Sequence, residues 1–351
     1  MRLRVPRALT TVLLASAALT SSCATEGTEA DDVEFDCDGP DCPFDVEPSI
    51  GNCQIGVLSA AWQTRAIDHV NRIRQSSGLK VVEHDAALDL ATASCALVNA
   101  GLDSISHEPP ASATCMSAAA KQGCLEGNLT RFRLAVRPTS LAVPASAARI
   151  RNALRTPEEF VESWLIDKTE DGNVGHRRWL LYPFMKSTSM GMGYRTSTGA
   201  DGATILDNLG VLQVLPKAFA DPDEETPTIV AYPVGDYPAT WVDPSYYLSV
   251  SLLVDRTNPA RNSAVNYDGA TVTVTRDGKP APLAVLASGE FDVRTSNEFF
   301  GLPNHVQFRL AEPIAPLASY TVVLDGVVVE DASGAASALP SRYEYTFRLV
   351  Q

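Results

Sequence analysis

The pattern of apolar residues changes near residue 220, and this change constrains the fold more than any other feature of the chain. Before Leu215, helix-like and strand-like segments are mixed, whereas after Pro227 every apolar segment has the pattern of a β-strand. The run Asp221-Pro222-Asp223-Glu224-Glu225 between them is polar and typical of a linker. We therefore predict an α+β domain over residues 55–215, a linker over 216–227 and a β-domain over 228–351.

Three amphipathic helices are predicted in the first domain. The first runs to Gly78, and its apolar residues recur at helical spacing: Leu58, Trp62, Ala66, Val70 and Ile73. The second opens at the capping residue Asp85 and ends near Gly101. The third starts at Thr156-Pro157-Glu158-Glu159, which combines a capping hydroxyl, an N-terminal proline and a capping-box glutamate, and it ends near Asp167. Strands are predicted from Gly175, over residues 190–194 and over 210–215.

The chain begins with the layout of a secretory signal. Three arginines precede an apolar run that is too short to span a bilayer, and small residues then lead to Cys23. Residues 1–22 are therefore predicted to be a signal peptide. Thr20-Ser21-Ser22-Cys23 also resembles a bacterial lipoprotein box, in which Cys23 would be lipidated and anchor the protein at the outer membrane. Leu19 lies one position farther from the cysteine than usual, so ordinary cleavage, which gives a secreted extracellular protein, is the alternative.

Residues 23–54 are predicted to form an acidic, cysteine-containing tether. Between Ala24 and Pro48 there are ten Asp or Glu residues and no Lys or Arg. They supply much of the net charge of −14, which argues against nucleic acid as a partner. Contact with a membrane is expected only through the lipid anchor, and no oligomeric state follows from the sequence.

The cysteines indicate disulfides. Setting aside Cys23 leaves an even number in an oxidising compartment: Cys37, Cys42, Cys53, Cys95, Cys115 and Cys124. Six cysteines permit 15 connectivities, and the sequence does not choose among them. Cys37 and Cys42 are close enough in sequence to close a small loop. Their spacing differs from that of a zinc ribbon, so metal binding is the weaker interpretation there.

A series of short motifs follows the order found in a known family. The motifs are Val70-Asn71-Arg72-Ile73-Arg74, Asp85-Ala86-Ala87-Leu88, Ser106-His107, Glu126-Gly127-Asn128-Leu129, Ser163-Trp164-Leu165-Ile166-Asp167, Gly175-His176 and Ser189-Met190-Gly191-Met192-Gly193-Tyr194. Together they resemble the CAP superfamily of cysteine-rich secretory, antigen 5 and pathogenesis-related 1 proteins. The resemblance implies an α-β-α sandwich with disulfides, and a groove lined by two histidines and two acidic residues.

Carried over residue by residue, the resemblance places His107, His176 and Asp167 in this groove. The fourth residue is Glu126, which is displaced by one position from the family's Gly-Glu-Asn. In extended backbone, a shift of one residue turns a side chain to the opposite face of the strand. Whether the Glu126 side chain points into the groove therefore stays open at this point. Arg177 and its neighbour also depart from the family pattern, in a way typical of bacterial members.

Several chemistries are open to these residues. His107 and His176 with one or two carboxylates suit a divalent metal such as zinc. Without a metal, one histidine would act as a general base, with its tautomer held by Asp167. In a third interpretation the histidines only orient helix ends. In the stretch after Gly175, Arg177 and Arg178 are expected to be surface or sheet-edge salt-bridge partners. The aromatic residues Trp179 and Tyr182 are expected to belong to the core.

The last part of the chain is predicted to be an immunoglobulin-like antiparallel β-sandwich. Six segments alternate or are rich in β-branched residues: 228–232, 247–252, 271–274, 305–310, 320–324 and 343–349. Asp277-Gly278 and Asp325-Gly326 are hairpin signals. No convergent catalytic set lies in this part, so a spacer or an adhesion module for carbohydrate or protein is expected.

The function expected from the sequence is ligand binding. The resemblance implies a lipid, a small hydrophobic molecule, a glycan or another protein as ligand, and it implies no agreed enzymatic reaction. The alternatives are an extracellular hydrolase of the peptidase type, dependent on a metal or on histidine, and a purely structural or adhesive surface protein.

Overall fold

A computed structural model describes residues 41–136, 145–169, 172–215, 219–220, 222–330 and 336–351. The predicted signal peptide, Cys23, Cys37 and the first part of the tether lie outside these residues. Signal cleavage, lipidation and the proposed domain boundaries therefore stay predictions. Residues of the predicted tether that are described include the short strand β1 (Phe44–Val46), which pairs with β2 (Val57–Leu58).

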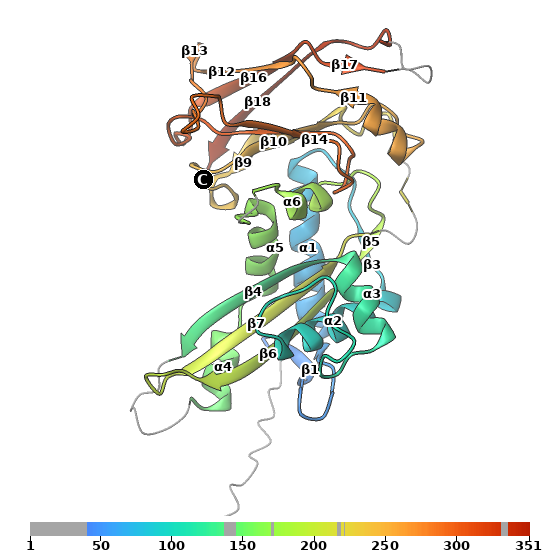
Figure 1. Ribbon diagram of the computed structural model, residues 1–351, viewed down its shortest axis with the longest axis vertical. Coiled ribbons are helices and arrows are strands. Elements are labelled where there is room, and N and C mark those ends of the chain that lie inside the picture. Colours follow the sequence, from blue (N-terminus) through green and yellow to red (C-terminus); the bar gives the residue numbers. More distant parts are fainter. Residues whose placement is uncertain (1–40, 137–144, 170–171, 216–218, 221, 331–335) are drawn as a thin grey trace, which may run out of the picture. The chain divides into compact units, whose positions relative to one another are not determined.

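A three-stranded antiparallel sheet forms the centre of the first part of the chain. Its order is β4 (Gly127–Val136), β7 (Thr204–Gln213) and β6 (Met190–Thr198), so the last strand in the sequence lies in the middle (Figure 1). The predicted strand at 190–194 is confirmed within β6, and the prediction over 210–215 covers only the end of β7. The edge strand β4 was not predicted. A further short pair is formed by β3 (Glu83–His84) and β5 (Ser187–Thr188), which run parallel.

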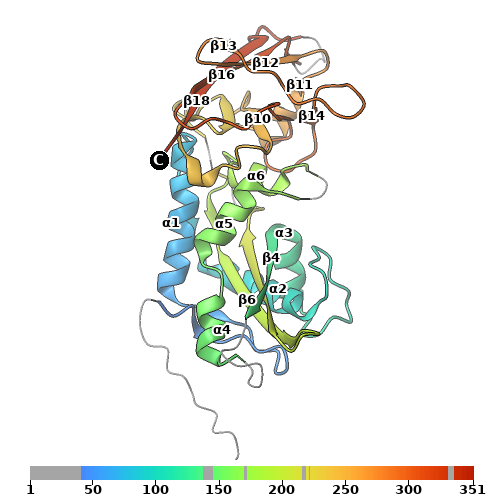
Figure 2. The same cartoon turned by 90° about the vertical axis from the view of Figure 1, so that its left-hand side faces the viewer.

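Helices cover both faces of this sheet. Figure 2 shows α1 (Ala60–Ser76) and α5 (Pro157–Ile166) on one side, and α2 (Asp89–Gly101) and α3 (Ala118–Glu126) on the other. The remaining helices of this part are η1 (Ala86–Leu88), α4 (Ala147–Ala153) and α6 (Gly175–Leu180). The fold is therefore of the α+β class, as predicted.

The capping signals placed the predicted helices well. Thr156 accepts from the N–H of Glu159, whose side chain in turn accepts from the N–H of Thr156, so the predicted capping box of α5 is present. Asp85 also caps a helix, although this is the single turn η1 that precedes α2. The first and third predicted helices are confirmed, and the second begins a few residues later than expected.

Two glycines let the helices approach the sheet closely. A Cβ at Gly191 of β6 would lie 2.3 Å from the backbone of Thr92 in α2, and one at Gly210 of β7 would lie 2.4 Å from the Phe160 ring in α5. Phe160 and Trp164, both fully buried, fill the layer between α5 and the sheet. The core therefore depends on the missing side chains at these two positions as well as on the aromatic residues.

The segment that starts at Gly175 is a helix, and the prediction of a strand there is wrong. Residues 175–180 form α6, which begins after Val174, a residue with φ of 48°. The N–H groups of His176 and Arg177 donate to the carboxylate of Asp167 at 2.9 and 3.3 Å, so a side chain from the preceding loop satisfies the free donors at the start of the helix. This tertiary cap overrides the aromatic, strand-like composition of the segment.

Two disulfides join parts of the first region. Cys53 pairs with Cys115, and the fully buried Cys95 of α2 pairs with Cys124 of α3. Cys42 is disulfide-bonded as well. The prediction that the cysteines form disulfides is confirmed for these residues.

The β-rich region, residues 228–351, contains two larger sheets. One has the order β14, β15, β10, β8, and the other has the order β13, β12, β16, β18, β9, in which β9 runs parallel to β18. This arrangement is compatible with a β-sandwich. The strands are β8 (Ile229–Tyr232), β9 (Gly235–Pro238), β10 (Leu248–Leu252), β11 (Val265–Asn266), β12 (Thr271–Arg276), β13 (Lys279–Pro280), β14 (Val293–Ser296), β15 (His305–Phe308), β16 (Ser319–Asp325), β17 (Val328–Val329) and β18 (Arg342–Val350). The short helices η2 (Ala239–Trp241) and η3 (Pro259–Ala264) connect strands.

The six predicted strands of this region are all present, but only one of the two hairpin signals forms a hairpin. Asp277 and Gly278 have φ of 50° and 75°, and the flanking strands β12 and β13 pair. Asp325-Gly326 instead links β16, which pairs with β12 and β18, to β17, which pairs with β11. The second turn therefore carries the chain between different sheets.

Candidate functional site

His176 is held by the buried carboxylate of Asp167. Asp167 follows the last residue of α5 with φ of 55°, and its side chain is fully buried. His176 Nδ1 lies 2.8 Å from Asp167 Oδ1, while the backbone N–H of His176 donates to Oδ2. Because the carboxylate accepts, we assign the ring proton to Nδ1, which leaves Nε2 as the free acceptor. The imidazole is therefore fixed in both orientation and tautomer.

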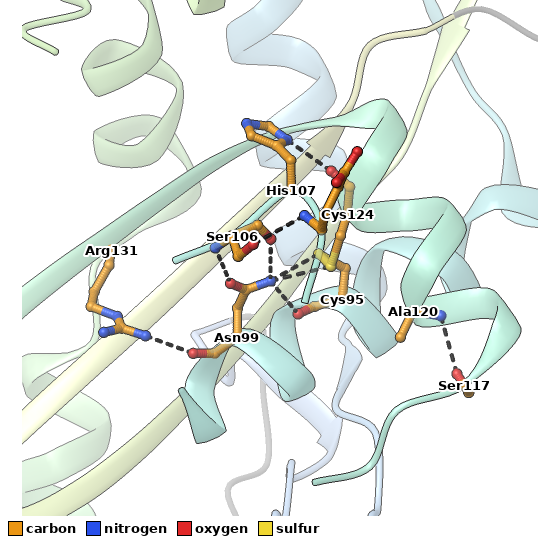
Figure 3. Close-up of a disulfide and its surroundings, with 9 residues drawn as sticks. Cys95, Asn99, Ser106, His107, Ser117, Ala120, Cys124 and Arg131 are labelled. Atoms are coloured by element: carbon orange, nitrogen blue, oxygen red, sulfur yellow. Dashed lines mark hydrogen bonds between the residues drawn. A yellow bond between two sulfur atoms is a disulfide. The ribbon is translucent and has the colours of Figure 1, made fainter. Parts of the chain in front are cut away.

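His107 lies in the loop after α2 and is positioned next to the Cys95–Cys124 disulfide, which joins α2 to α3. Its Nδ1 lies 2.8 Å from the carbonyl oxygen of Cys124, and the Asn99 side chain accepts from the N–H of Ser106 at 2.7 Å and donates to its carbonyl at 3.2 Å. Figure 3 shows this loop resting on the Cys95–Cys124 disulfide, with the His107 ring on the other side of Ser106 from Asn99. A carbonyl accepts only, so Nδ1 of His107 carries its proton and Nε2 is the free atom here too.

Glu126 lies at the same site despite its shifted position in the sequence. It is the last residue of α3, and its Oε2 accepts from the side-chain amides of Gln122 at 3.2 Å and Gln213 at 2.9 Å. The hypothesis that it could miss the groove assumed extended backbone, in which a shift by one residue reverses the side chain. Because Glu126 ends a helix, that argument does not apply.

These residues share one cavity of about 450 Å³. His107, Glu126 and His176 line it, together with polar groups from Asn128, Thr169 and Asn173. Its apolar lining comes from Leu125, Trp179, Val214, Leu215, Phe299 and Phe300. Asp167 lies behind His176 and does not line the cavity, so it acts through the histidine. A volume of this size suits a small molecule.

A comparison with known families identifies one domain of the chain. The family model of CAP, the cysteine-rich secretory protein family, matches residues 67–207. The chain carries a CAP domain. No curated protein shows significant similarity to the chain. CAP domains are in general ligand-binding domains of extracellular type, and disulfides fit an oxidising compartment. Within the described ranges, no helix is both long and apolar enough to span a membrane.

Asn128 of the CAP domain supports the same helix, a role that the sequence did not indicate. Its side-chain amide donates to the carbonyl oxygen of His176 at 2.9 Å, and the residue is almost completely buried. Asn128-Leu129-Thr130 matches a glycosylation sequon, but this amide nitrogen faces the protein interior. Asn128 therefore holds the start of α6 against strand β4.

Arg177 and Arg178 are buried, so the prediction of surface or sheet-edge salt bridges is wrong. Arg177 donates to the carbonyls of Leu165 and Ile166 and, across to the β-rich region, to the carbonyl of Tyr247 and the hydroxyl of Ser249. Its guanidinium also lies 4.0 Å from the centre of the Tyr232 ring. Burial lowers the pKa of Arg177. The two arginines that depart from the family pattern are thus contacts between the CAP domain and the β-rich region.

Trp179 and Tyr182 belong to the core, as predicted. Trp179 is 8% exposed and Tyr182 is fully buried, and their rings meet edge to face with centroids 5.5 Å apart. Trp179 also lines the cavity.

The donor set does not form a metal site with three ligands. Among the residues that the structure describes, no group of three or more His, Cys, Asp or Glu side chains could hold a metal ion. Asp167 is occupied by two backbone N–H groups and one imidazole, and Glu126 already accepts from two amides. Within the described chain, Nε2 of His107 and Nε2 of His176 make no hydrogen bond, so these two atoms are open to a ligand.

A second cavity of similar size, about 470 Å³, is lined by residues of the first part of the chain. It also contains a histidine and an aspartate, His84 and Asp89, with Nε2 2.8 Å from Oδ1. The same Oδ1 accepts from Ser189 Oγ at 2.6 Å and from the side-chain amide of Gln63 at 3.0 Å. No motif in the sequence points to this pair.

Proposed function

We propose that this chain is an exported protein whose CAP domain binds a small amphipathic molecule in the cavity lined by His107, Glu126 and His176. The chain would be anchored at the outer membrane through Cys23 or be released by ordinary signal cleavage. The carrying observation is that one cavity of about 450 Å³ combines oriented imidazoles with an aromatic and aliphatic wall. Such a combination of few polar groups and much apolar surface is typical of small-molecule sites.

The polar end of the ligand would meet the histidines. Nε2 of each imidazole accepts a hydrogen bond when neutral and donates one when protonated, so a hydroxyl or a carboxyl group can be bound here. The apolar end would cover Leu125 and Phe299, which are 53% and 44% exposed. Removing such surface from water contributes to affinity at roughly 25 cal/mol per Å² before the costs of association.

The test is a titration of dansylaminoundecanoic acid, a fluorescent acyl carboxylate, into wild-type protein and into the double variant His107→Ala/His176→Ala. We expect saturable binding to the wild type and at least tenfold weaker binding to the double variant. His84→Ala is the matched control, because this histidine lines the other cavity. The proposal fails if the wild type shows no saturable binding, or if His84→Ala weakens binding as much as the double variant does. If a glycan or a protein displaces the fluorescent probe and other acyl carboxylates do not, the ligand belongs to the class of the competitor.

A histidine-dependent hydrolase is the second candidate, and the His176–Asp167 pair favours it. A carboxylate that holds Nδ1 of a histidine orients Nε2 to take a proton from a water or a hydroxyl. Zinc would need a third protein ligand besides Nε2 of His107 and His176, so no metal-dependent step is derived. Turnover of fluorogenic peptide and ester substrates by the wild type, and its loss in Asp167→Asn, would support this candidate. Absence of turnover above the double histidine variant would exclude it for those substrates.

Metal binding is tested separately. We expect the purified protein to gain no stoichiometric zinc at micromolar concentration, in metal analysis and in titration. Stoichiometric zinc that is lost in His107→Ala/His176→Ala would show that the two histidines form a metal site with a ligand from outside the described residues.

A further inference from the structure

We infer that residues 298–302 of the β-rich region form the specificity-determining wall of the CAP-domain cavity, with Phe299 as the surface on which the apolar part of the ligand packs. This inference rests on the proposed function, and it gives the β-rich region a part in recognition instead of the role of a spacer. The segment joins strands β14 and β15, more than a hundred residues after His176.

Phe299 extends an aromatic cluster that begins in the CAP domain. Its ring meets Trp179 and Tyr182 edge to face, with centroids 5.8 and 6.1 Å apart. Although it is packed on these rings, Phe299 remains 44% exposed, and both Phe299 and Phe300 line the cavity. An aromatic side chain held from behind and open in front is a surface that can bind an apolar group with little loss of entropy.

Arg178 fastens this segment to helix α6. One of its terminal nitrogens donates to the carbonyl oxygens of Glu298 at 2.5 Å and Leu302 at 3.1 Å, at the two ends of the segment. The Phe300 ring lies 5.6 Å from the guanidinium carbon. Burial lowers the pKa of Arg178 to about 10, so the guanidinium is still charged at neutral pH. His176 lies two residues before Arg178 in α6. The same short helix therefore carries the imidazole and fastens the wall.

Gly301 allows the segment to lie directly on α6. Its φ is +80°, and a Cβ at this position would lie 2.3 Å from the carbonyl oxygen of Arg178. Any side chain would therefore push the segment away from the helix, in addition to straining the backbone. Gly289 offers a matched comparison, because its φ is +90° and nothing lies within 4 Å of a Cβ there.

The two sides of the cavity define the chemical class of the ligand. His107, His176 and Glu126 lie on the CAP side, while Phe299 and Phe300 come from the β-rich region. A molecule that contacts both needs a polar group and an apolar chain or ring within the length of one cavity. A single-chain amphiphile with a carboxyl or hydroxyl end has this character.

The test compares variants of the full chain in the titration with dansylaminoundecanoic acid. Phe299→Ala is expected to weaken binding about tenfold, which corresponds to about 1.4 kcal/mol. Phe299→Leu, which keeps apolar volume, is expected to weaken it less. Phe291→Ala is the control, since Phe291 is a 62% exposed aromatic residue outside the cavity. Gly301→Ala is expected to weaken binding and to raise quenching of tryptophan fluorescence by acrylamide, while Gly289→Ala changes neither.

The outcomes separate the inference from the proposed function. If the histidine variants lose binding but Phe299→Ala, Phe299→Leu and Gly301→Ala bind as the wild type does, the inference is overturned and the proposed function stands. If the wild type does not bind, both are overturned. Circular dichroism identifies a variant that fails to fold, and in that case Phe299→Leu decides, because it alters neither the backbone nor the contacts of Arg178.

Discussion

Two cavities are each lined by a histidine that lies 2.8 Å from an aspartate, yet they differ in how the pair is held. In the His176 cavity the aspartate side chain is fully buried and also binds two backbone N–H groups. In the His84 cavity Asp89 is 44% exposed, and its Oδ1 is shared among a histidine, a serine and a glutamine. The short distance alone therefore does not distinguish a functional pair.

The difference shows what makes one histidine available for a ligand. His176 uses Nδ1 for the aspartate, so Nε2 is left for the cavity, whereas His84 uses Nε2 itself for Asp89. The His176 cavity is also lined by Phe299 and Phe300 of the β-rich region, whereas the lining of the His84 cavity comes from the first part of the chain only. The two sites therefore differ in two respects: the aspartate orients His176 through Nδ1, and a segment distant in sequence contributes a wall only to the His176 cavity.

The largest expected effect comes from removing the frame of the His176 cavity. Arg177→Met keeps much of the side-chain volume but leaves buried oxygens of Leu165, Tyr247 and Ser249 without their donor. We expect the free energy of unfolding to fall by about 3 kcal/mol, since each unsatisfied buried group costs about 1–3 kcal/mol. Urea denaturation measures the change.

The control for this variant is Arg65→Ala. Arg65 forms a bidentate bond with Glu158 but is 37% exposed, so its loss is expected to cost only about 0.5 kcal/mol. Equal effects of the two variants would contradict the view that Arg177 joins the two regions.

A smaller effect is expected from the aspartates themselves. The Asp167 carboxylate accepts hydrogen bonds from three N–H groups of His176 and Arg177. Asp167→Asn replaces one of its oxygens by an NH₂ group, which cannot accept, and we expect it to destabilise the protein by about 2 kcal/mol. Asp89→Asn, in the exposed pair, is expected to cost about 0.5 kcal/mol. A larger loss for Asp89→Asn than for Asp167→Asn, in the same denaturation experiment, would reverse the comparison.

The pH dependence of stability is expected to report on the contact behind the His176 cavity. His305 is buried near Arg177 and Arg178, and burial followed by these two charges holds its pKa well below the usual value. The unfolded chain therefore takes up a proton near pH 6.5 that the folded protein resists, so stability is present above that pH and is lost as the pH falls below it. The expected loss is at most about 1.4 kcal/mol per pH unit for this residue.

His305→Gln provides the measurement for this residue. Between pH 7 and pH 5, the free energy of unfolding of the variant should fall less steeply than that of the wild type. Identical slopes for wild type and His305→Gln would show that His305 is not held neutral by this contact.

Much of the fold was predictable because its signals are local. The capping box at Thr156 and the helical spacing of apolar residues up to Gly78 fix two helices within their own turns. The six strands of the β-rich region follow from alternation and β-branched residues, and Asp277-Gly278 has the backbone that its hairpin requires. These features need no knowledge of distant contacts.

The remaining features depend on contacts that are distant in sequence. Helix α6 was mistaken for a strand because its cap is the Asp167 carboxylate, nine residues before His176, and because its arginines bind carbonyls of the β-rich region. The family resemblance brought His107, His176 and Asp167 to one place, but Asn99, Asn128 and Phe299 had no sequence signal. Two adjacent arginines predict a charged surface when the buried acceptors of their guanidinium groups are not known.

The most direct test of the central claim observes both cavities in one sample. Long-range ¹H–¹⁵N NMR spectra of the histidine rings resolve Nδ1 and Nε2, and undecanoic acid is titrated into the labelled wild-type protein. The account predicts that the Nε2 signals of His107 and His176 shift together with one saturation curve, while those of His84 stay in place. Unchanged signals of His107 and His176, or a shift confined to His84, would contradict it.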